Sequence, residues 1–256
     1  YLRRRRCPRR SRAAGPAGLV THSDEKLMDP EPAAVVDQPD LSIVVPAFDE
    51  AERLPETIST LLGFLGERAG RSELVVVDDG SSDSTAALTA DLLGGRTDCS
   101  LVVLGRHRGK GAAVRAGILA SSGARIVFMD ADLATDLEDM DRVLASLDDA
   151  DVVLGSRRVP GSQVEGLTTP AALAHRGFAC LARVVTGVPV ADFQCGFKAF
   201  RAPTAKVLFD QIREPGFAFD VEVLMVASRM GLRIAEVPVR WQAMGGSHIS
   251  LAKDSV

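Results

Sequence analysis

From residue 41 onward, short apolar runs alternate with longer segments in which apolar residues recur at helical spacing. The runs are rich in valine and isoleucine without polar alternation, which is typical of strands covered on both faces. Repeated strand–helix units predict an α/β fold with a mostly parallel central sheet and flanking helices. The predicted strands are Leu41–Val45, Glu73–Val77, Leu101–Leu104, Arg125–Met129 and Asp151–Leu154, and the predicted helices are Glu52–Gly66, Ser84–Leu93, Gly111–Ser121 and Leu137–Leu147.

After Ser156 the alternation becomes less regular. A loop with prolines and glycines leads to a predicted helix over 170–185, a short apolar run over 197–200, a helix over 220–230 and a last strand over 232–241. No linker separates this part from the first part. We therefore expect one domain over residues 41–250, with halves 41–158 and 159–250, followed by a short end over 251–256.

The first 40 residues show neither helical nor strand periodicity, and we expect a disordered tail there. Residues 1–12 contain seven arginines and no acid, so a net charge of −4 for the chain leaves −11 for the remainder. An acidic body argues against nucleic-acid binding. The four cysteines form no close pair, which fits a reducing compartment, and no stretch reaches the length of a membrane span.

Two carboxylates close one of the apolar runs. Asp130 and Asp132 follow Arg125–Met129, where a buried strand passes into a loop. Carboxylates at the edge of a core require a cation or hydrogen-bond donors. An Asp-x-Asp pair at the carboxyl end of a strand suits Mg²⁺ or Mn²⁺ against a substrate diphosphate, because hard cations prefer oxygen ligands. A helix cap beside a solvated loop acid is the alternative interpretation.

Other polar groups follow neighbouring strands, and ligands of open parallel sheets bind beyond these strand ends. Asp78 and Asp79 follow the second strand, where they either cap the next helix or accept hydrogen bonds from a base or ribose. The segment Arg106–Gly111 places glycines around Lys110, which suits phosphate near a helix start, although it lacks Walker spacing and also fits a solvated turn. The sequence contains neither G-x-S-x-G nor H-E-x-x-H, which disfavours hydrolase and zinc chemistry.

Together, these motifs resemble family 2 glycosyltransferases with a GT-A, nucleotide-diphosphosugar-binding fold. The matching segments are Val45–Glu50, Val77–Asp83, Arg108–Arg115 and Asp130–Asp132. The second half is similar to dolichyl-phosphate β-glucosyltransferases and bacterial polyprenyl-phosphate relatives. Its matching segments are Asp192–Lys198, Phe217–Glu222, Glu236–Trp241 and Gly246-Ser247.

The resemblance implies roles for residues of this sequence. The nucleotide-sugar pocket would be lined by Pro46, Glu50, Asp78, Asp79 and Lys110. The metal and diphosphate would lie at Asp130 and Asp132. The acceptor phosphate would be held by Arg157, Arg176 and His248. The sugar and acceptor side would be lined by Asp192, Gln194, Asp220 and Glu222. Two residues depart from the family pattern: His107 stands where relatives commonly carry asparagine, and His248 where many carry lysine or arginine.

The implied reaction is inverting transfer of glucose from UDP-glucose to a polyprenyl phosphate, with Mg²⁺ or Mn²⁺ as cofactor. Catalysis would rest on Asp132, Arg157, Asp192 and Asp220. Because the acceptor phosphate is already an anion, Asp192 and Asp220 would position sugar hydroxyls rather than remove protons. The alternatives are GDP-mannose as donor, a soluble acceptor, a catalytically silent nucleotide-sugar binding module, and a nucleotidyltransferase. The last is disfavoured because no glycine- and arginine-rich loop follows the first strand.

A lipid acceptor implies work at a membrane surface, and we expect a cytoplasmic protein bound peripherally to the cytoplasmic face, directly or through a membrane-protein partner. In the predicted helix over 170–185, one face would be apolar with arginines beside it. The residues of that face are Leu173, Phe178, Leu181, Val184 and Val185. Alternatively, this helix packs on the core.

Overall fold

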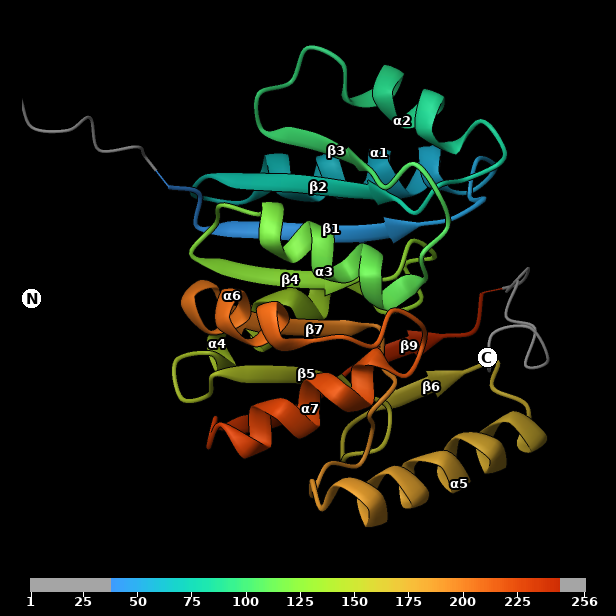
Figure 1. Cartoon of the computed structure of the whole chain (residues 1–256), viewed down its shortest axis with the longest axis vertical. Helices are drawn as coiled ribbons and strands as arrows, with labels where there is room; N and C mark the ends of the chain where they lie inside the picture. The colour runs from blue at the N-terminus through green and yellow to red at the C-terminus, as the bar shows by residue number, and fades with distance from the viewer. Residues whose placement is uncertain (1–37, 245–256) are drawn as a thin grey trace, which may run out of the picture. The chain divides into compact units, whose positions relative to one another are not determined.

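A seven-stranded sheet runs through the protein in the order β3-β2-β1-β4-β7-β5-β8 (Figure 1). The structure is a computed structural model that describes residues 38–244. A second, two-stranded sheet pairs β6 with β9. The strands are β1 (Leu41–Ala47), β2 (Ser72–Asp78), β3 (Cys99–Val103), β4 (Arg125–Met129), β5 (Val152–Ser156), β6 (Gln163–Glu165), β7 (Phe197–Arg201), β8 (Ile234–Pro238) and β9 (Arg240–Gln242).

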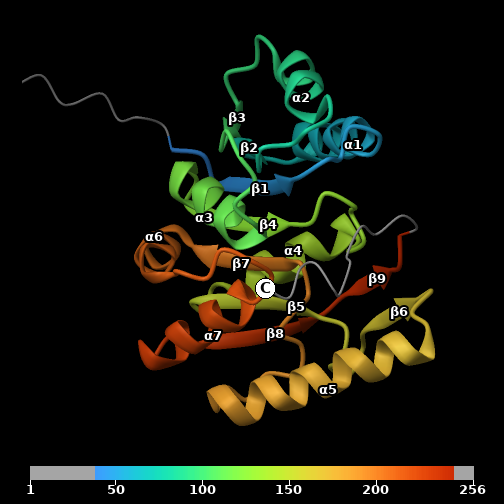
Figure 2. The same cartoon turned by 45° about the vertical axis from the view of Figure 1, so that its right-hand side comes forward.

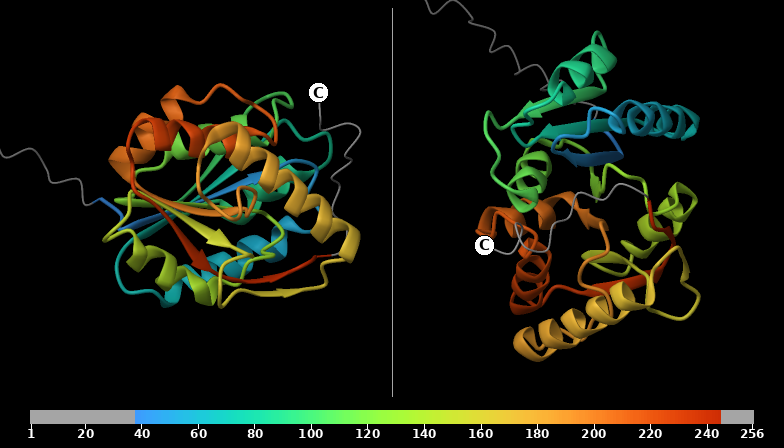
Figure 3. Two further views of the ribbon diagram at one scale, coloured as in Figure 1. Left: turned by 90° about the horizontal axis from the view of Figure 1, so that it is seen from below. Right: turned by 90° about the vertical axis from the view of Figure 1, so that its right-hand side faces the viewer.

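Helices cover both faces of the large sheet (Figures 2 and 3). They are α1 (Leu54–Glu67), α2 (Thr85–Leu93), α3 (Lys110–Ala120), α4 (Met140–Ser146), α5 (Thr169–Thr186), α6 (Ala202–Gln211) and α7 (Phe219–Arg229), with a 3₁₀ turn over Leu137–Asp139 before α4. One core layer joins the sheet to α3, α5, α6 and α7, and the other joins it to α1, α2 and α4. The layered α/β arrangement follows because the central strands β1 and β4 are buried on both faces.

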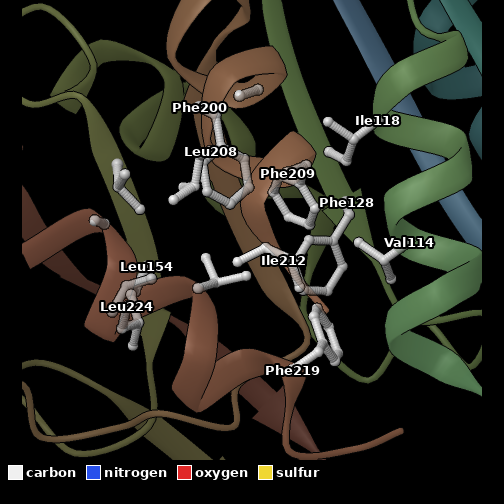
Figure 4. Packing of buried hydrophobic residues seen from close by; sticks show 14 of the residues in the cluster. Val114, Ile118, Phe128, Leu154, Phe200, Leu208, Phe209, Ile212, Phe219 and Leu224 are labelled. Atoms are coloured by element: carbon white, nitrogen blue, oxygen red, sulfur yellow. The ribbon is translucent and has the colours of Figure 1, made fainter. Parts of the chain in front are cut away.

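The first of these cores is built around aromatic side chains from both halves of the chain. Figure 4 shows Phe128 of β4 beside Phe209 of α6 and Phe219 of α7. The ring centroids of Phe128 and Phe219 lie 5.7 Å apart, and those of Phe200 and Phe209 lie 5.4 Å apart at right angles. The start of α7 is therefore packed directly on the strand that leads to Asp130.

The sheet is mostly parallel, as predicted, with one antiparallel insertion. β1 pairs in parallel with β2 and β4, and β5 pairs in parallel with β8. Strand β7, which the sequence shows only as a short apolar run, lies antiparallel between β4 and β5. The second half of the chain thus supplies a central strand rather than an addition at the edge.

The element predictions differ from the structure at several places, including β6, which was expected to be part of a loop. The predicted last strand is two strands, because the chain leaves the large sheet after Pro238 and β9 pairs with β6 instead. Helix α6 was missed, although Pro203 in its first turn is a helix-start signal. The backbone of the domain begins slightly earlier than expected, because Pro39 O accepts a hydrogen bond from Ala124 N. Among residues 38–244, no helix combines the length and apolar character needed to cross a bilayer.

Candidate nucleotide-sugar site

A cleft of about 670 Å³ opens where β1, β2 and β4 end. Its walls come from the segment after β1, the start of α3, the turn after β4 and the loop over 214–217. Six predicted site residues line this one cleft: Pro46, Glu50, Asp79, Lys110, Asp130 and Asp132. Residues from distant parts of the sequence therefore converge at the carboxyl ends of the strands, where ligands of such sheets bind.

Asp79 holds the loop that precedes α3. Its carboxylate accepts hydrogen bonds from the backbone N–H groups of Arg108 (2.9 Å) and Gly109 (2.7 Å), and His107 Nδ1 lies 2.9 Å from its Oδ2. Burial raises the pKa of Asp79, while these backbone donors and His107 act in the opposite direction. Gly109 has φ +104°, and a Cβ there would clash with Pro215 O, so this position requires glycine. The segment predicted to approach phosphate is thus fixed at the cleft.

Asp78 is buried behind the cleft and does not line it. Its carboxylate accepts hydrogen bonds from Gly80 N (3.1 Å) and Ser81 N, and so shapes the turn after β2. The start of α2 is instead bonded by Asp83, whose Oδ1 accepts from Thr85 N at 2.9 Å. The alternative that Asp78 and Asp79 cap this helix is therefore wrong.

Asp130 and Asp132 lie on the turn that follows β4. Lys110 Nζ lies 2.7 Å from Asp130 Oδ1, and Asp132 Oδ1 accepts a hydrogen bond from Ala134 N at 3.0 Å. Leu133 has φ 49°, a left-handed conformation that is uncommon for a branched residue and that is often found at functional sites. Gly196 packs so closely that a Cβ there would clash with the Asp130 carboxylate.

The electrostatics of this turn leave negative charge available for a ligand. Burial raises the pKa of Asp132, and the neighbouring Asp130 raises it further. The N–H of Ala134 and the charges of Lys110 and Arg53 act in the opposite direction but leave the pKa raised, so the ionised Asp132 is only partly compensated. Lys110 Nζ lies beside Asp130, and the pKa of Lys110 is raised by Asp130, Asp220 and Asp132 despite burial.

These residues fit a divalent cation held jointly with a diphosphate. Within residues 38–244, no group of three or more His, Cys, Asp or Glu side chains is arranged to hold a metal. Mg²⁺ does not need such a group, because proteins often hold it through one or two carboxylates and leave the remaining positions to substrate phosphates and water. Asp130 and Asp132 supply that number of carboxylates at the wall of the cleft.

Two of the predicted acceptor-side residues, Arg157 and Asp192, bind each other outside the cleft lining. Arg157 donates to Asp192 through Nε (2.7 Å) and Nη2 (2.9 Å), and its guanidinium lies 5.3 Å from the centroid of the Trp241 ring. Although burial opposes ionisation, the hydrogen bonds and charge of Arg157 lower the pKa of Asp192 to about 2. The two residues form a buried, bidentate ion pair.

The remaining predicted residues have separate positions. Asp220 is buried against Lys198 Nζ at 2.6 Å. Glu222 Oε2 accepts from Arg213 N and Glu214 N, and so anchors the loop that forms one wall of the cleft. Gln194 N donates to Asp192 Oδ1 at 3.2 Å, and Arg176 is exposed on α5. His248 lies outside the described residues.

Sequence reasoning missed three contributors to the cleft. The His107 ring stacks on Phe48 with centroids 4.0 Å apart, which gives the rim an aromatic surface. Lys110 Nζ lies 5.7 Å from the centroid of the Phe217 ring. Thr57 Oγ1 of α1 donates to Ala131 O at 2.5 Å, which fixes the turn between the two aspartates. The loop bearing Phe217 carries no local signal that would place it here.

Comparisons with known proteins identify relatives of this chain. The family model described as "Glycosyl transferase family 2" matches residues 42–209. A dolichyl-phosphate beta-glucosyltransferase of Dictyostelium discoideum is 35% identical over 237 residues, covering 84% of this chain and 72% of the relative. The Homo sapiens protein of the same name is 33% identical over 224 residues, covering 82% of this chain and 69% of the relative.

Solved structures share the fold at lower identity. Glucosyl-3-phosphoglycerate synthase from Mycobacterium tuberculosis, in complex with Mn²⁺, UDP and glucosyl-3-phosphoglycerate, matches with a TM-score of 0.59 and 19% identity, covering 84% of this chain and 74% of that chain. A second structure of the same enzyme matches with a TM-score of 0.60 and 21% identity, covering 84% of this chain and 75% of that chain.

Proposed function

Since the chain belongs to glycosyl transferase family 2, we propose that it transfers glucose from UDP-glucose to the phosphate of a dolichyl-type polyprenol with inversion. The predicted GT-A fold is confirmed by the likeness to the solved structures. The observation that carries the proposal is the convergence of Asp79, Lys110, Asp130 and Asp132 on one cleft. The names of the relatives that match most of the chain support the choice of sugar and acceptor.

On the donor side, each residue of the cleft has a task that its position supports. Asp79 and the loop it holds would bind the nucleoside, and the ring of His107 on Phe48 offers a surface for the base. Asp130 and Asp132 would hold Mg²⁺ or Mn²⁺, which neutralises the charge of the leaving diphosphate when bound. Lys110 places a second positive charge beside Asp130. Binding of UDP and Mn²⁺ by a protein of the same fold is consistent with this arrangement.

On the acceptor side, the phosphate of the lipid would attack the anomeric carbon as an anion, so that no general base is required. Asp192 keeps the Arg157 guanidinium in one orientation, and Arg176 adds a positive charge from α5. These arginines would hold the acceptor phosphate, with His248 as a further donor. In-line placement of donor and acceptor is the main contribution that the protein can make to such a displacement.

Helix α5 supports contact with a membrane surface. Its inner face packs on the core through Ala179 and Ala182, whereas its outer face exposes large apolar side chains. Those exposed side chains are Leu173 (70%), Leu181 (63%), Val184 (78%) and Val185 (73%). The helix contains Arg176 and Arg183 but no acid, in a body that is otherwise acidic. We propose peripheral attachment at the cytoplasmic face through this surface, with or without a membrane-protein partner.

Transfer can be tested with radiolabelled sugar nucleotides and polyprenyl phosphate in detergent. We expect glucose in the lipid phase only with UDP-glucose and Mg²⁺ or Mn²⁺. If label entered the lipid phase from GDP-mannose and not from UDP-glucose, the proposed donor would be wrong. Tight binding of UDP-glucose without turnover on any acceptor would favour a catalytically silent binding module and contradict the proposal.

Membrane contact can be tested by flotation with vesicles of phosphatidylcholine and phosphatidylserine. Val184→Asp with Val185→Asp should reduce binding at least about tenfold, because two charges would enter the apolar layer. Val207→Asp on α6 is the matched control, since Val207 is 53% exposed on another helix. Equal binding of both variants would contradict the role of α5.

A further inference from the structure

Lys198 is a buried cation in the middle of the sheet. It lies on β7, is 0% exposed, and sits 5.3 Å from the centroid of the Phe128 ring. Its Nζ donates to Cys195 O at 2.7 Å and to Asp220 Oδ1 at 2.6 Å. Burying a lysine costs free energy unless its charge is paired and its donors are hydrogen-bonded, so a lysine at this position is expected to have a structural or functional role.

The first partner of Lys198 belongs to the turn beneath Asp130. Cys195 O accepts from Lys198, and the next residue, Gly196, accepts a hydrogen bond from Asp130 N at 3.1 Å through its own carbonyl. The Cα of Gly196 also lies against the Asp130 carboxylate, where no side chain fits. The position of this turn therefore sets the position of Asp130.

The second partner belongs to the start of α7, which packs against the start of α3. An added Cβ at Gly111 would lie 2.6 Å from Phe219 Cβ, so the two helix starts are in contact. Ala112 N donates to Pro215 O in the loop before α7. Through Asp220, Lys198 thus fixes the element on which Lys110 and its neighbours rest.

We propose that Lys198 is a positioning residue that holds Asp130 and Lys110 in register across the sheet. One ammonium group ties the turn under Asp130 to the helix that supports Lys110, and this keeps their 2.7 Å ion pair aligned with the cleft. Asp220 then acts through Lys198 rather than on the sugar. The proposal deepens the proposed function, on which its kinetic test rests.

The variant that isolates this role replaces both charges. Lys198→Met alone leaves Asp220 buried without its partner and is expected to fold poorly. Lys198→Met with Asp220→Leu removes the pair together, and apolar replacement of a buried ion pair often preserves stability. Lys206→Met is the matched control, because Lys206 Nζ also donates to backbone carbonyls, those of Ile118, Leu119 and Ser121, but at the far end of α3.

Hydrogen–deuterium exchange on the full chain provides a readout that needs no substrate. In the folded double variant, exchange at the Asp130 amide should be at least about tenfold faster than in wild type, because its acceptor turn is released. The Lys206→Met control should leave this amide protected. Unchanged protection at Asp130 in the folded double variant would overturn the proposal, whether or not the chain transfers glucose.

Kinetics give the second readout. The double variant should raise KM for UDP-glucose about tenfold or more and leave KM for polyprenyl phosphate unchanged, since the displaced groups line the donor cleft. An equal change in both KM values, or a change in neither, would count against positioning of the donor site. Absence of transfer in wild type would contradict the proposed function and leave the exchange result to decide the role of Lys198.

Discussion

The two halves of the chain hold the buried carboxylates of the candidate site in different ways. In the nucleotide half, Asp79 and Asp132 accept hydrogen bonds from backbone N–H groups and line the cleft. In the acceptor half, Asp192 and Asp220 are paired with the buried cations Arg157 and Lys198. A backbone donor stabilises an ionised carboxylate without cancelling its net charge, whereas an ion pair cancels that charge. The first arrangement suits binding of a cation, and the second keeps the side chains of Arg157 and Lys198 in fixed positions.

This contrast predicts opposite costs of mutation. Removing one partner of a buried ion pair leaves an uncompensated charge, which strongly destabilises the fold. Removing the charge of Asp132, whose pKa is raised by burial and by Asp130, relieves that cost and should leave folding intact. Activity and stability should therefore separate between the two halves.

The largest effect on stability is expected for Arg157→Met. Asp192 would remain buried without its partner, and the free energy of unfolding should fall by about 3–5 kcal/mol. Urea denaturation followed by circular dichroism measures this change. The double variant with Asp192→Asn should recover part of the loss. A loss below about 1 kcal/mol for the single variant would show that the pair is not the support inferred here.

The largest effect on activity is expected for Asp132→Asn. Loss of a charge at the diphosphate should lower kcat by about 10²–10³-fold. Because burial and Asp130 raise the pKa of Asp132, its ionised form destabilises the fold above that pKa, so the variant should be equally or more stable at pH 7. Initial rates and thermal melting measure both properties, and retained activity would remove Asp132 from the site.

Ionisation of Asp192 should affect stability in the opposite sense to ionisation of Asp132, because it stabilises the fold. Its pKa falls from the ordinary 3.8 to about 2, so its ionised form stabilises the fold above pH 4, and this contribution is lost as the pH falls towards 2. At 1.36 kcal/mol per pK unit, up to about 2.5 kcal/mol is involved. Unfolding titrations between pH 5 and 2 should show the stability of wild type and Asp192→Asn converging. Parallel curves would contradict the assignment.

The smallest predicted loss concerns Gly196→Ala. The added Cβ would displace the Asp130 carboxylate and should lower kcat/KM for UDP-glucose by about tenfold, as misplacement near a reacting centre does. Gly177→Ala on α5 is the control, because nothing lies within 4 Å of its added Cβ. That control should retain activity and gain about 0.5–1 kcal/mol of stability from helix propensity. Equal activity of the two variants would rule out the close approach to Asp130.

Local patterns in the sequence predicted the parts of the fold that depend on local chemistry. Apolar runs located β1, β2 and β4, and parallel strands end at one edge, so the convergence of Asp79 and Asp130 followed. The antiparallel position of β7 depends on pairing with distant strands, which an isolated apolar run does not encode. The sequence next to Asp79 fits a helix cap equally well, and only the hydrogen bond from the backbone of Arg108, which is distant in sequence, excludes it.

The same limit applies to the acceptor side. The resemblance marked Arg157 and Asp192 individually, but nothing in the sequence indicated that they bind one another across 35 residues. Lys198 offered a local signal, a lysine within the apolar strand Phe197–Arg201. The sequence does not indicate that Lys198 binds Cys195 O and Asp220, because the second contact depends on how α7 packs against the sheet.

The central place of β7 bears on how the protein can be divided. Residues 125–129 and 152–156 belong to the first half of the chain, yet they meet only through a strand made later, over 197–201. A truncated chain that stops at residue 158 would leave one edge of β4 and both edges of β5 unpaired, because β8 is also made later. We therefore expect such a fragment to aggregate. We also expect chimaeras that exchange the acceptor half between relatives to fold only when β7 comes from the same protein as β4 and β5.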